Sequence, residues 1–249
     1  MPEGLQRLWR TFFDIDQIRA ALPEIVIVGV PNTILLSIVA TLIGLALGLV
    51  VAMLLISRSW LVRSPARMYV DVFRGLPVIL TIYLVGQGLP IAGLKIFGNN
   101  SYAYAALALG LIEGAYMAEI FRSGIQSVEK GQAEASRSLG MSYLETMRWV
   151  VVPQGIRRVL PALTGQFIHI IKGSSLVYLL GLLPSQREIF SIASDASYIS
   201  GTLAPMVAAG IVYLCLTIPL TYAVNLFDRR LREGRRSPEP IAATAEVHV

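Results

Sequence analysis

The sequence has 249 residues, of which 55% are hydrophobic and 15% charged, whereas an ordinary soluble domain has about 25% charged residues. This composition excludes an ordinary soluble domain and indicates a membrane protein. The single cysteine, Cys215, lies in an apolar run, which excludes a disulfide framework and predicts no metal site. The formal net charge of +5 has to be interpreted from where Lys and Arg lie along a membrane topology, not from the total.

The N-terminal segment, residues 1–28, predicts an amphipathic helix. Large apolar residues recur there at helical spacing with Arg and Asp between them: Leu5, Leu8, Trp9, Phe12 and Phe13. Such a pattern is typical of a helix that lies in the membrane interface and contacts lipid. The sequence VPNT at 30–33 predicts a break before the first membrane span.

Five segments are apolar enough to cross a bilayer, which takes about 20 residues each. They are residues 33–56, 75–94, 101–121, 160–183 and 203–227. The expected fold class is therefore all-α, a polytopic membrane protein with one transmembrane domain over residues 29–232. The tail, residues 233–249, shows no apolar period and is predicted to be disordered.

Basic residues are distributed unequally between the two sides of these spans. The N-terminal segment and the second and fourth loops hold five Lys and Arg, whereas the first loop, the central loop and the tail hold fourteen. The positive-inside rule then predicts an N-terminus outside the cell and a C-terminus in the cytoplasm. Arg74 and Lys172 fit neither set of loops.

The central loop, about 123–158, predicts an ordered structure in the cytoplasm. Residues 132–139 favour a helix, Gly140 fits a left-handed cap, and Ser142 with Glu145 fits a capping box that begins a second helix, which Pro153 should end. Apolar residues are expected to share one face on each helix: Ala135 and Leu139 on the first, and Leu144, Met147 and Val151 on the second. This favours a docking element. A DNA-binding helix-turn-helix and a surface loop without a partner are the alternatives, and the scattered basic residues disfavour nucleic acid.

Charged residues inside spans usually face a partner or a water-filled path, because each costs about 2.5–3.5 kcal/mol on insertion scales. Glu113 and Lys172 lie near the middle of the third and fourth spans. They either pair with each other or contact a zwitterionic substrate. Four further residues in the spans are polar: Arg74, Ser174 and Ser175 are assigned to the substrate path, and His169 to packing or hydrogen bonding.

The central loop also resembles a known family. Glu134, Ala135 and Ser136 are followed by Gly140 and, thirteen residues later, by Pro153. This spacing resembles the Glu-Ala-Ala…Gly…Pro loop of the permease subunits of ATP-binding-cassette (ABC) importers. Three neighbouring motifs resemble the binding-protein-dependent branch for polar amino acids and opines: residues 73–77, 114–132 and 170–182.

The resemblance implies the five-helix type I permease fold, with a cytoplasmic coupling helix that docks into a separate ATPase. It implies import of polar amino acids by alternating access. It assigns the ATPase contact to five residues: Glu134, Ala135, Ser136, Gly140 and Pro153. Two departures are visible: Ser136 replaces the usual second Ala, and Gly173 with Ser174 stand where an acidic residue and Thr are frequent, which disfavours a cationic substrate side chain.

No phosphate-binding sequence GxxxxGK[ST] occurs in the chain, so ATP hydrolysis is expected on a partner. The chain is then not an enzyme and holds no cofactor of its own, since the partner ATPase binds ATP and Mg²⁺. The expected partners are two ATPase copies, a second permease copy or paralogue, and an extracytoplasmic binding protein, all at the bacterial inner membrane. Two alternatives stay open: an ion-coupled secondary transporter or channel with Glu113 and Lys172 as a relay, and a membrane-anchored transcription regulator.

Overall fold

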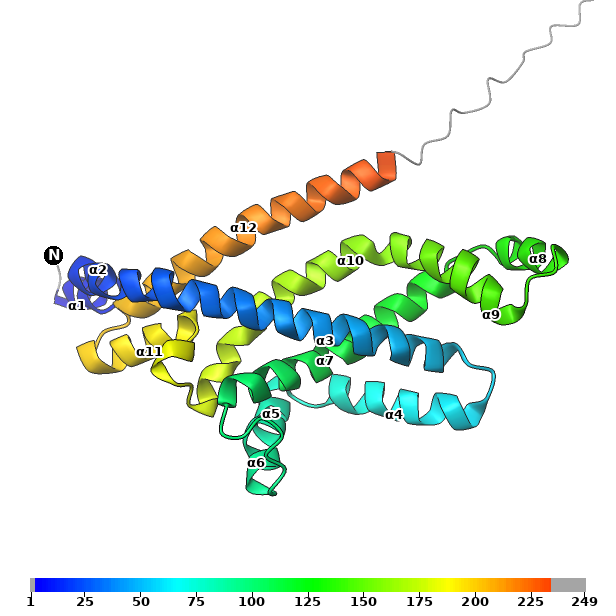
Figure 1. Cartoon of the computed structure of the whole chain (residues 1–249). Coiled ribbons are helices and arrows are strands. Elements are labelled where there is room, and N and C mark those ends of the chain that lie inside the picture. Colours follow the sequence, from blue (N-terminus) through cyan, green and yellow to red (C-terminus); the bar gives the residue numbers. More distant parts are fainter. Residues whose placement is uncertain (1–2, 234–249) are drawn as a thin grey trace, which may run out of the picture.

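The computed structural model describes residues 3–233, which form helices and no strand. The helices make a long bundle (Figure 1). At one end lie α1 (Glu3–Phe12), α2 (Ile15–Glu24) and α11 (Ile189–Ser200), and at the other lie α8 (Lys130–Ser138) and the short α9 (Tyr143–Glu145). We call these the α11 end and the α8 end. The predicted disordered tail lies outside the described residues, except for Glu233.

The core of the bundle is α7 (Ser101–Gln126), against which α3 (Val30–Ile56) packs closely. A Cβ atom added at Gly48 of α3 would lie 2.8 Å from Cβ of Met117, and one added at Gly110 of α7 would lie 2.5 Å from Cγ2 of Ile43. Small residues on both helices therefore let the backbones approach, as in other membrane helix pairs. The face of Gly110 and Gly114 is therefore a packing face.

The N-terminal part of the chain is more continuous than predicted. A π-helical turn, η1 (Ile25–Gly29), joins α2 directly to α3. The predicted break at residues 30–33 is wrong. Pro31 stands in the first turn of α3, directly after the π-helical turn, and the irregular hydrogen bonding of that turn accommodates a residue without an N–H. The large apolar side chains of α1 are exposed, as the predicted interfacial helix requires.

A helix precedes the second predicted span. Residues 60–75, expected to be mainly a loop, form the helix α4 (Trp60–Gly75), which buries Ala66 and Val70. The chain then bends by 110° before α5 (Val78–Tyr83), η2 (Leu84–Gly88) and α6 (Leu89–Ile91). Gly75 and Pro77 flank this bend. Because α4 is strongly amphipathic, no long apolar run marked its start.

The predicted fourth span corresponds to α10 (Val152–Gly173), which continues as a 3₁₀ helix, η4 (Ser174–Leu180). Close contact with α7 occurs at Gly155, where an added Cβ would lie 2.7 Å from the backbone of Ile125. The last helix is α12 (Ala204–Glu233), at the edge of the bundle. By length and composition, three described helices are membrane spans, or four if the bent pair α4 and α5–α6 is one span. α10 is not among them, since it carries Arg157, Arg158 and Lys172.

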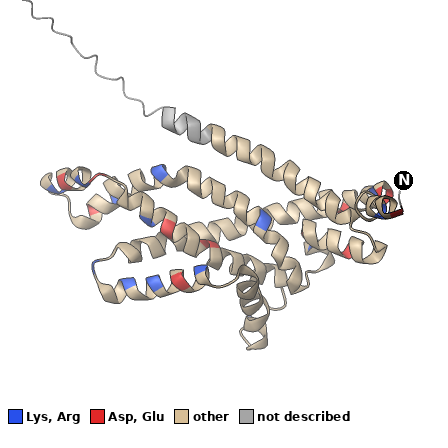
Figure 2. Ribbon diagram, turned by 180° about the vertical axis from the view of Figure 1, so that it is seen from behind, with Lys and Arg blue, Asp and Glu red and all other residues tan. Residues whose placement is uncertain are grey.

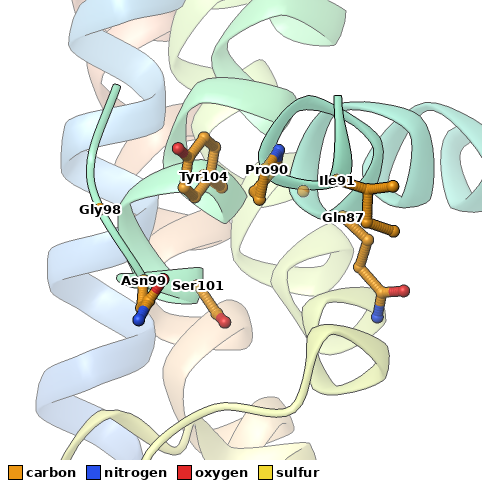
Figure 3. A pocket seen from close by; sticks show the side chains of 8 residues that line it. Gln87, Pro90, Ile91, Gly98, Asn99, Ser101 and Tyr104 are labelled. Carbon is orange, nitrogen blue, oxygen red and sulfur yellow. The ribbon is translucent and has the colours of Figure 1, made fainter. Parts of the chain in front are cut away.

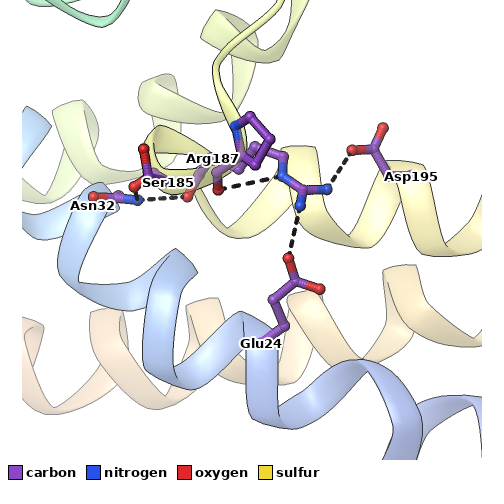
Figure 4. A network of polar contacts seen from close by, with 6 residues as sticks. Glu24, Asn32, Ser185, Arg187 and Asp195 are labelled. Carbon is purple, nitrogen blue, oxygen red and sulfur yellow. Dashed lines mark hydrogen bonds and ion pairs between the residues drawn. The ribbon is translucent and has the colours of Figure 1, made fainter.

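At the α11 end, polar contacts connect the segment after η4 to the first span (Figure 4). Arg187 pairs with Glu24 at 2.9 Å and with Asp195 at 2.8 Å. Asn32 donates to the carbonyl oxygens of Ser185, in the short turn η5 (Pro184–Gln186), and of Arg187, at 2.9 and 3.0 Å. These contacts hold α2, α3 and α11 together at this end.

Candidate functional site

Two places in the fold carry unusual polar chemistry. One is the structure at the α8 end, residues 123–158, which we call the knob. The other is an exposed face of α10. We describe the knob first, because its local sequence determines its shape most directly.

The turn in the knob is the one that the sequence predicts. α8 ends before Gly140, whose φ of +88° lies in the left-handed region. Ser142 then accepts from the backbone N–H of Glu145, and the Glu145 carboxylate accepts from the backbone N–H of Ser142 at 2.7 Å, so the capping box is confirmed. These hydrogen bonds hold the pKa of Glu145 below its ordinary value.

Pro153 does not end the second helix, which corrects the prediction. α9 runs through a π-helical segment, η3 (Thr146–Val151), directly into α10, and Pro153 stands in the first turn of α10. A π-helical segment disrupts the regular hydrogen-bond pattern, so a residue without an N–H fits beside it. The knob and the fourth span are therefore one helical unit.

The base of the knob is packed and its tip is exposed. Four apolar side chains fill the base: Ile125, Val128, Met147 and Val151. Arg58 of the turn between α3 and α4 lies over the ring of Tyr143, with its Cζ 5.8 Å from the ring centroid. The prediction that Leu144 shares the buried face of Met147 is wrong, because Leu144 is 77% exposed. Leu139 is 85% exposed.

The predicted ATPase contact residues divide into exposed and inward ones. Glu134 and Ala135 are exposed, with Leu139, beside Gly140. Ser136 is buried and donates to the carbonyl oxygen of Gln132. The Ser136 side chain packs inside the knob, so this position requires a small residue. Pro153 lies at the base of the knob, in the first turn of α10.

The second place is a stripe on α10. Between residues 160 and 173 the exposed residues are Ala162, Gly165, His169 and Lys172. Their spacing of three, four and three puts them on one helix face. Because two of the four are polar and cations are costly in lipid, this face points to water or to another protein surface and not to acyl chains.

Glu113 does not pair with Lys172, so that alternative is wrong. The Glu113 side chain is buried between α7 and α10, where its carboxylate accepts from Nε2 of Gln166 and lies 3.4 Å from Nδ1 of His169. Lys172 is exposed, and no salt bridge reaches it among the described side chains. The expected hydrogen bonding of His169 is confirmed. Lys172 was expected as the partner of Glu113 because both residues lie at a similar depth in the membrane. The signal that was overlooked is that Gln166 and His169 lie three residues apart, on one face of α10, and can both contact one carboxylate.

The other predicted path residues are placed as follows. Arg74 is exposed, and its Cζ lies 5.3 Å from the ring centroid of Tyr116, one turn after Glu113. Ser174 is fully buried and donates to its own helix, at Ile171 O, so its hydroxyl does not reach the exposed face. Ser175 donates to Lys172 O.

Charged residues at the α8 end are organised around Glu119. Its carboxylate pairs with Arg67 of α4 at 2.9 Å and with Arg122, three residues further along α7. Figure 2 shows Lys and Arg along α4, at α8 and at the start of α10. α4 and α7 are thereby joined close to the knob.

A pocket of about 310 Å³ lies between η2–α6 and the start of α7 (Figure 3). Its polar residues are Gln87, Asn99, Ser101 and Tyr104, and no charged residue lines it. The pocket thus offers nothing to neutralise the two charges of a zwitterion. The stripe on α10 offers a cation and a carboxylate-bound imidazole, and it is the better candidate for a charged small molecule.

Comparison with known proteins gives a consistent result. A family model described as "Binding-protein-dependent transport system inner membrane component" matches residues 44–233. The arginine transport system permease protein ArtQ of Bacillus subtilis is 33% identical over 86% of this chain and 97% of its own length. The octopine transport system permease protein OccM of Rhizobium meliloti is 32% identical over the full length of both chains.

Solved structures agree with the fold. One, titled "Crystal structure of an amino acid ABC transporter with histidines", matches with a TM-score of 0.70 at 29% identity, over 92% of this chain and 99% of that one. The MetNI methionine ABC transporter in an inward-facing form matches with a TM-score of 0.70 at 20% identity. The second likeness supports the fold alone.

Proposed function

The chain belongs to the family of binding-protein-dependent transport system inner membrane components, and from this premise we propose how it works as a permease of an amino acid ABC importer. The observation that carries the function is the family match over residues 44–233, together with relatives named for arginine and octopine that align over most of their length. As a member of this family the chain is a multi-pass inner-membrane protein. It works with an ATPase and with a substrate-binding protein.

We propose that the knob is the contact with the ATPase. Exposed Glu134 and Ala135, with Leu139 and Leu144, give it an apolar and acidic tip, and the packed base makes it rigid enough to transmit a displacement. Gly140 fixes the angle between α8 and α9. Ser136 and Pro153 act inside the knob, where they shape it without touching the partner. ATP and Mg²⁺ are then bound by the partner, and this chain carries no cofactor.

We propose that the exposed stripe of α10 lines the substrate path. A chain with so few spans cannot enclose a route by itself, so a second copy or a paralogue would supply the facing half. Ala162 and Gly165 leave room on this face, and His169 and Lys172 supply polar groups. Arg74 stands beside the path on α4. Ser175 lies next to it, whereas Ser174 supports the 3₁₀ helix from inside.

The orientation follows from charge. The basic residues of the first and central loops lie toward the α8 end, and the positive-inside rule puts that end in the cytoplasm. The α11 end, with α1 and α2, then faces the outside, where the binding protein delivers the substrate. Two ATPase copies would serve the two knobs of a permease dimer.

Reconstitution tests this proposal. The permease is purified in mild detergent with its co-purifying subunits, placed in liposomes, and given a panel of labelled L-amino acids with the binding protein. We expect uptake of amino acid only when ATP is supplied on the side of the liposome membrane where the knob lies. Uptake driven by an ion gradient through the chain alone would support a secondary transporter instead. Sequence-selective retention of DNA would support a regulator, which the family match does not favour.

A further inference from the structure

The buried carboxylate of Glu113 leaves one question that the substrate path does not answer. An amino acid carries an ammonium group. The third and fourth predicted spans hold two acidic residues, Glu113 and Glu119. Glu119 is already paired with Arg67 and Arg122. Yet Glu113 is 3% exposed, so a substrate on the exposed face cannot reach it. Whatever Glu113 contributes to binding has to pass through a side chain that touches both the carboxylate and the path.

His169 is such a side chain. Its Nδ1 lies 3.4 Å from Oε1 of Glu113, while 59% of the side chain is exposed. With Glu113 ionised, its carboxylate only accepts hydrogen bonds, so Nδ1 then carries the proton and donates it. In a neutral imidazole the other nitrogen, Nε2, is then an acceptor, and this tautomer is fixed by the contact that Nδ1 makes. Gln166 donates to the same carboxylate and keeps it in place.

Lys172 lies three residues after His169, on the same exposed face of α10. Side chains three apart on a helix have Cβ atoms about 5–6 Å from each other. That separation suits the two charged groups of one α-amino acid, which are joined through a single carbon. An ammonium group prefers an acceptor backed by negative charge, and a carboxylate prefers a cation.

We propose that His169 Nε2 accepts a hydrogen bond from the substrate ammonium, that Lys172 Nζ binds the substrate carboxylate, and that Glu113 is a positioning residue which acts through His169. This inference rests on the proposed function and deepens it. It makes the backbone-like part of the substrate, common to all α-amino acids, the part that this chain recognises. The site is matched to a zwitterion because it contains one negative and one positive group.

The test measures equilibrium binding to the assembled importer in detergent, without the binding protein. The two probes are the L-amino acid that the wild-type importer takes up best and its analogue without the α-amino group. The variants are Glu113→Gln, His169→Leu, His169→Gln and Lys172→Gln. Thr164→Val is the matched control, since the Thr164 hydroxyl donates only to its own helix, at Leu160 O and Pro161 O.

Loss of one hydrogen bond to a charged group should weaken binding about tenfold or more. We expect Glu113→Gln and His169→Leu each to weaken binding of the amino acid by about that factor and to leave the analogue unchanged. A Gln at 113 offers an amide that can donate to Nδ1 and reverse the tautomer. Lys172→Gln should weaken both probes alike, and Thr164→Val neither.

A double-mutant cycle separates positioning from plain structure. His169→Gln keeps an acceptor oxygen that needs no help from Glu113, so adding Glu113→Gln to it should cause little further loss. Equal losses for both probes in Glu113→Gln, or fully additive losses in the double variant, would overturn the proposal. If Glu113→Gln fails to assemble, the test rests on His169→Leu, which should still assemble because the His169 side chain is mostly exposed. If His169→Leu then discriminates between the two probes as wild type does, the contact between His169 and the substrate ammonium is refuted.

The wild-type complex separates this inference from the proposed function. If the complete importer takes up no amino acid, the proposed function fails and the inference fails with it. If uptake is normal and all path variants bind both probes as wild type does, only the inference is refuted.

Discussion

Replacing Gly140 in the knob should weaken attachment of the ATPase through the backbone alone. Gly140 has φ +88°, and a Cβ atom added there would meet nothing within 4 Å. Steric clash inside the chain is therefore excluded. What remains is the cost of a left-handed conformation, about 1–2 kcal/mol for an ordinary L-residue, with a β-branched residue at the high end or beyond it.

Two hydrogen bonds show what this strain would loosen. The N–H of Gly140 donates to Arg137 O at 3.0 Å, and that of Met141 donates to Ser136 O at 3.2 Å. A cost of about 1–2 kcal/mol corresponds to roughly a 5- to 30-fold increase in opening of this turn. Gly140→Val should open it most and Gly140→Ala less. Gly140→Asn should be nearly neutral, because Asn tolerates the left-handed region.

Hydrogen exchange at residues 136–141 measures the opening, and the ratio of ATPase to permease after purification measures docking. Along the series glycine, asparagine, alanine and valine at position 140, exchange should become faster and the ratio of ATPase to permease should fall. Membrane insertion should stay unchanged. If Gly140→Asn loses the ATPase as completely as Gly140→Val while exchange stays slow, the partner touches this position and strain is not the cause. Normal exchange and normal docking in Gly140→Val would refute the reasoning altogether.

Three further outcomes are expected. Gly155→Ala should destabilise the bundle by about 1–3 kcal/mol, as overpacking does, because its Cβ would press on the backbone of Ile125; Gly165→Ala, with open space around it, should show no such fall in melting temperature. Arg187→Ala releases two carboxylate partners and should raise hydrogen exchange at the α11 end but not at the knob. The stabilising contribution of Glu145 is present above its ordinary pKa and is lost as the pH falls through its lowered pKa; the protection factors of the amides at the start of α9, which correct for the intrinsic pH dependence of exchange, should fall on such acidification and should stay constant with pH in Glu145→Gln.

Local chemistry predicted the knob well. A left-handed glycine and a capping box are determined by neighbouring residues, so Gly140, Ser142 and Glu145 were identified without knowledge of the fold. The partner of Glu113 is different, since it depends on which way two helices face. Sequence gives the depth of a residue in the membrane but not the rotation of its helix.

The two errors at proline have a common physical cause. Pro31 and Pro153 were both expected to interrupt helices, and both follow a π-helical segment, η1 or η3, that leads into the first turn of the next helix. The π-helical segment supplies the irregular hydrogen bonding that a residue without an N–H requires. Nothing in the composition of IVIVG or TMRWVV distinguishes such a segment from ordinary α-helix, so continuity at these prolines could not be predicted from sequence.

Continuity at Pro153 gives the fold a mechanical consequence. Helical structure runs without a break from Tyr143 in the knob to Gly173 beside the stripe, a length of about 45 Å at 1.5 Å per residue. His169 and Lys172 therefore stand on the same helical element that emerges at the proposed ATPase contact, and α7 packs against that element at Gly155. No loop lies between the knob and the stripe, so we expect a rotation of the knob to be transmitted to the stripe. Under the proposed function, substrate contact and ATP-driven movement would then involve the same helical element.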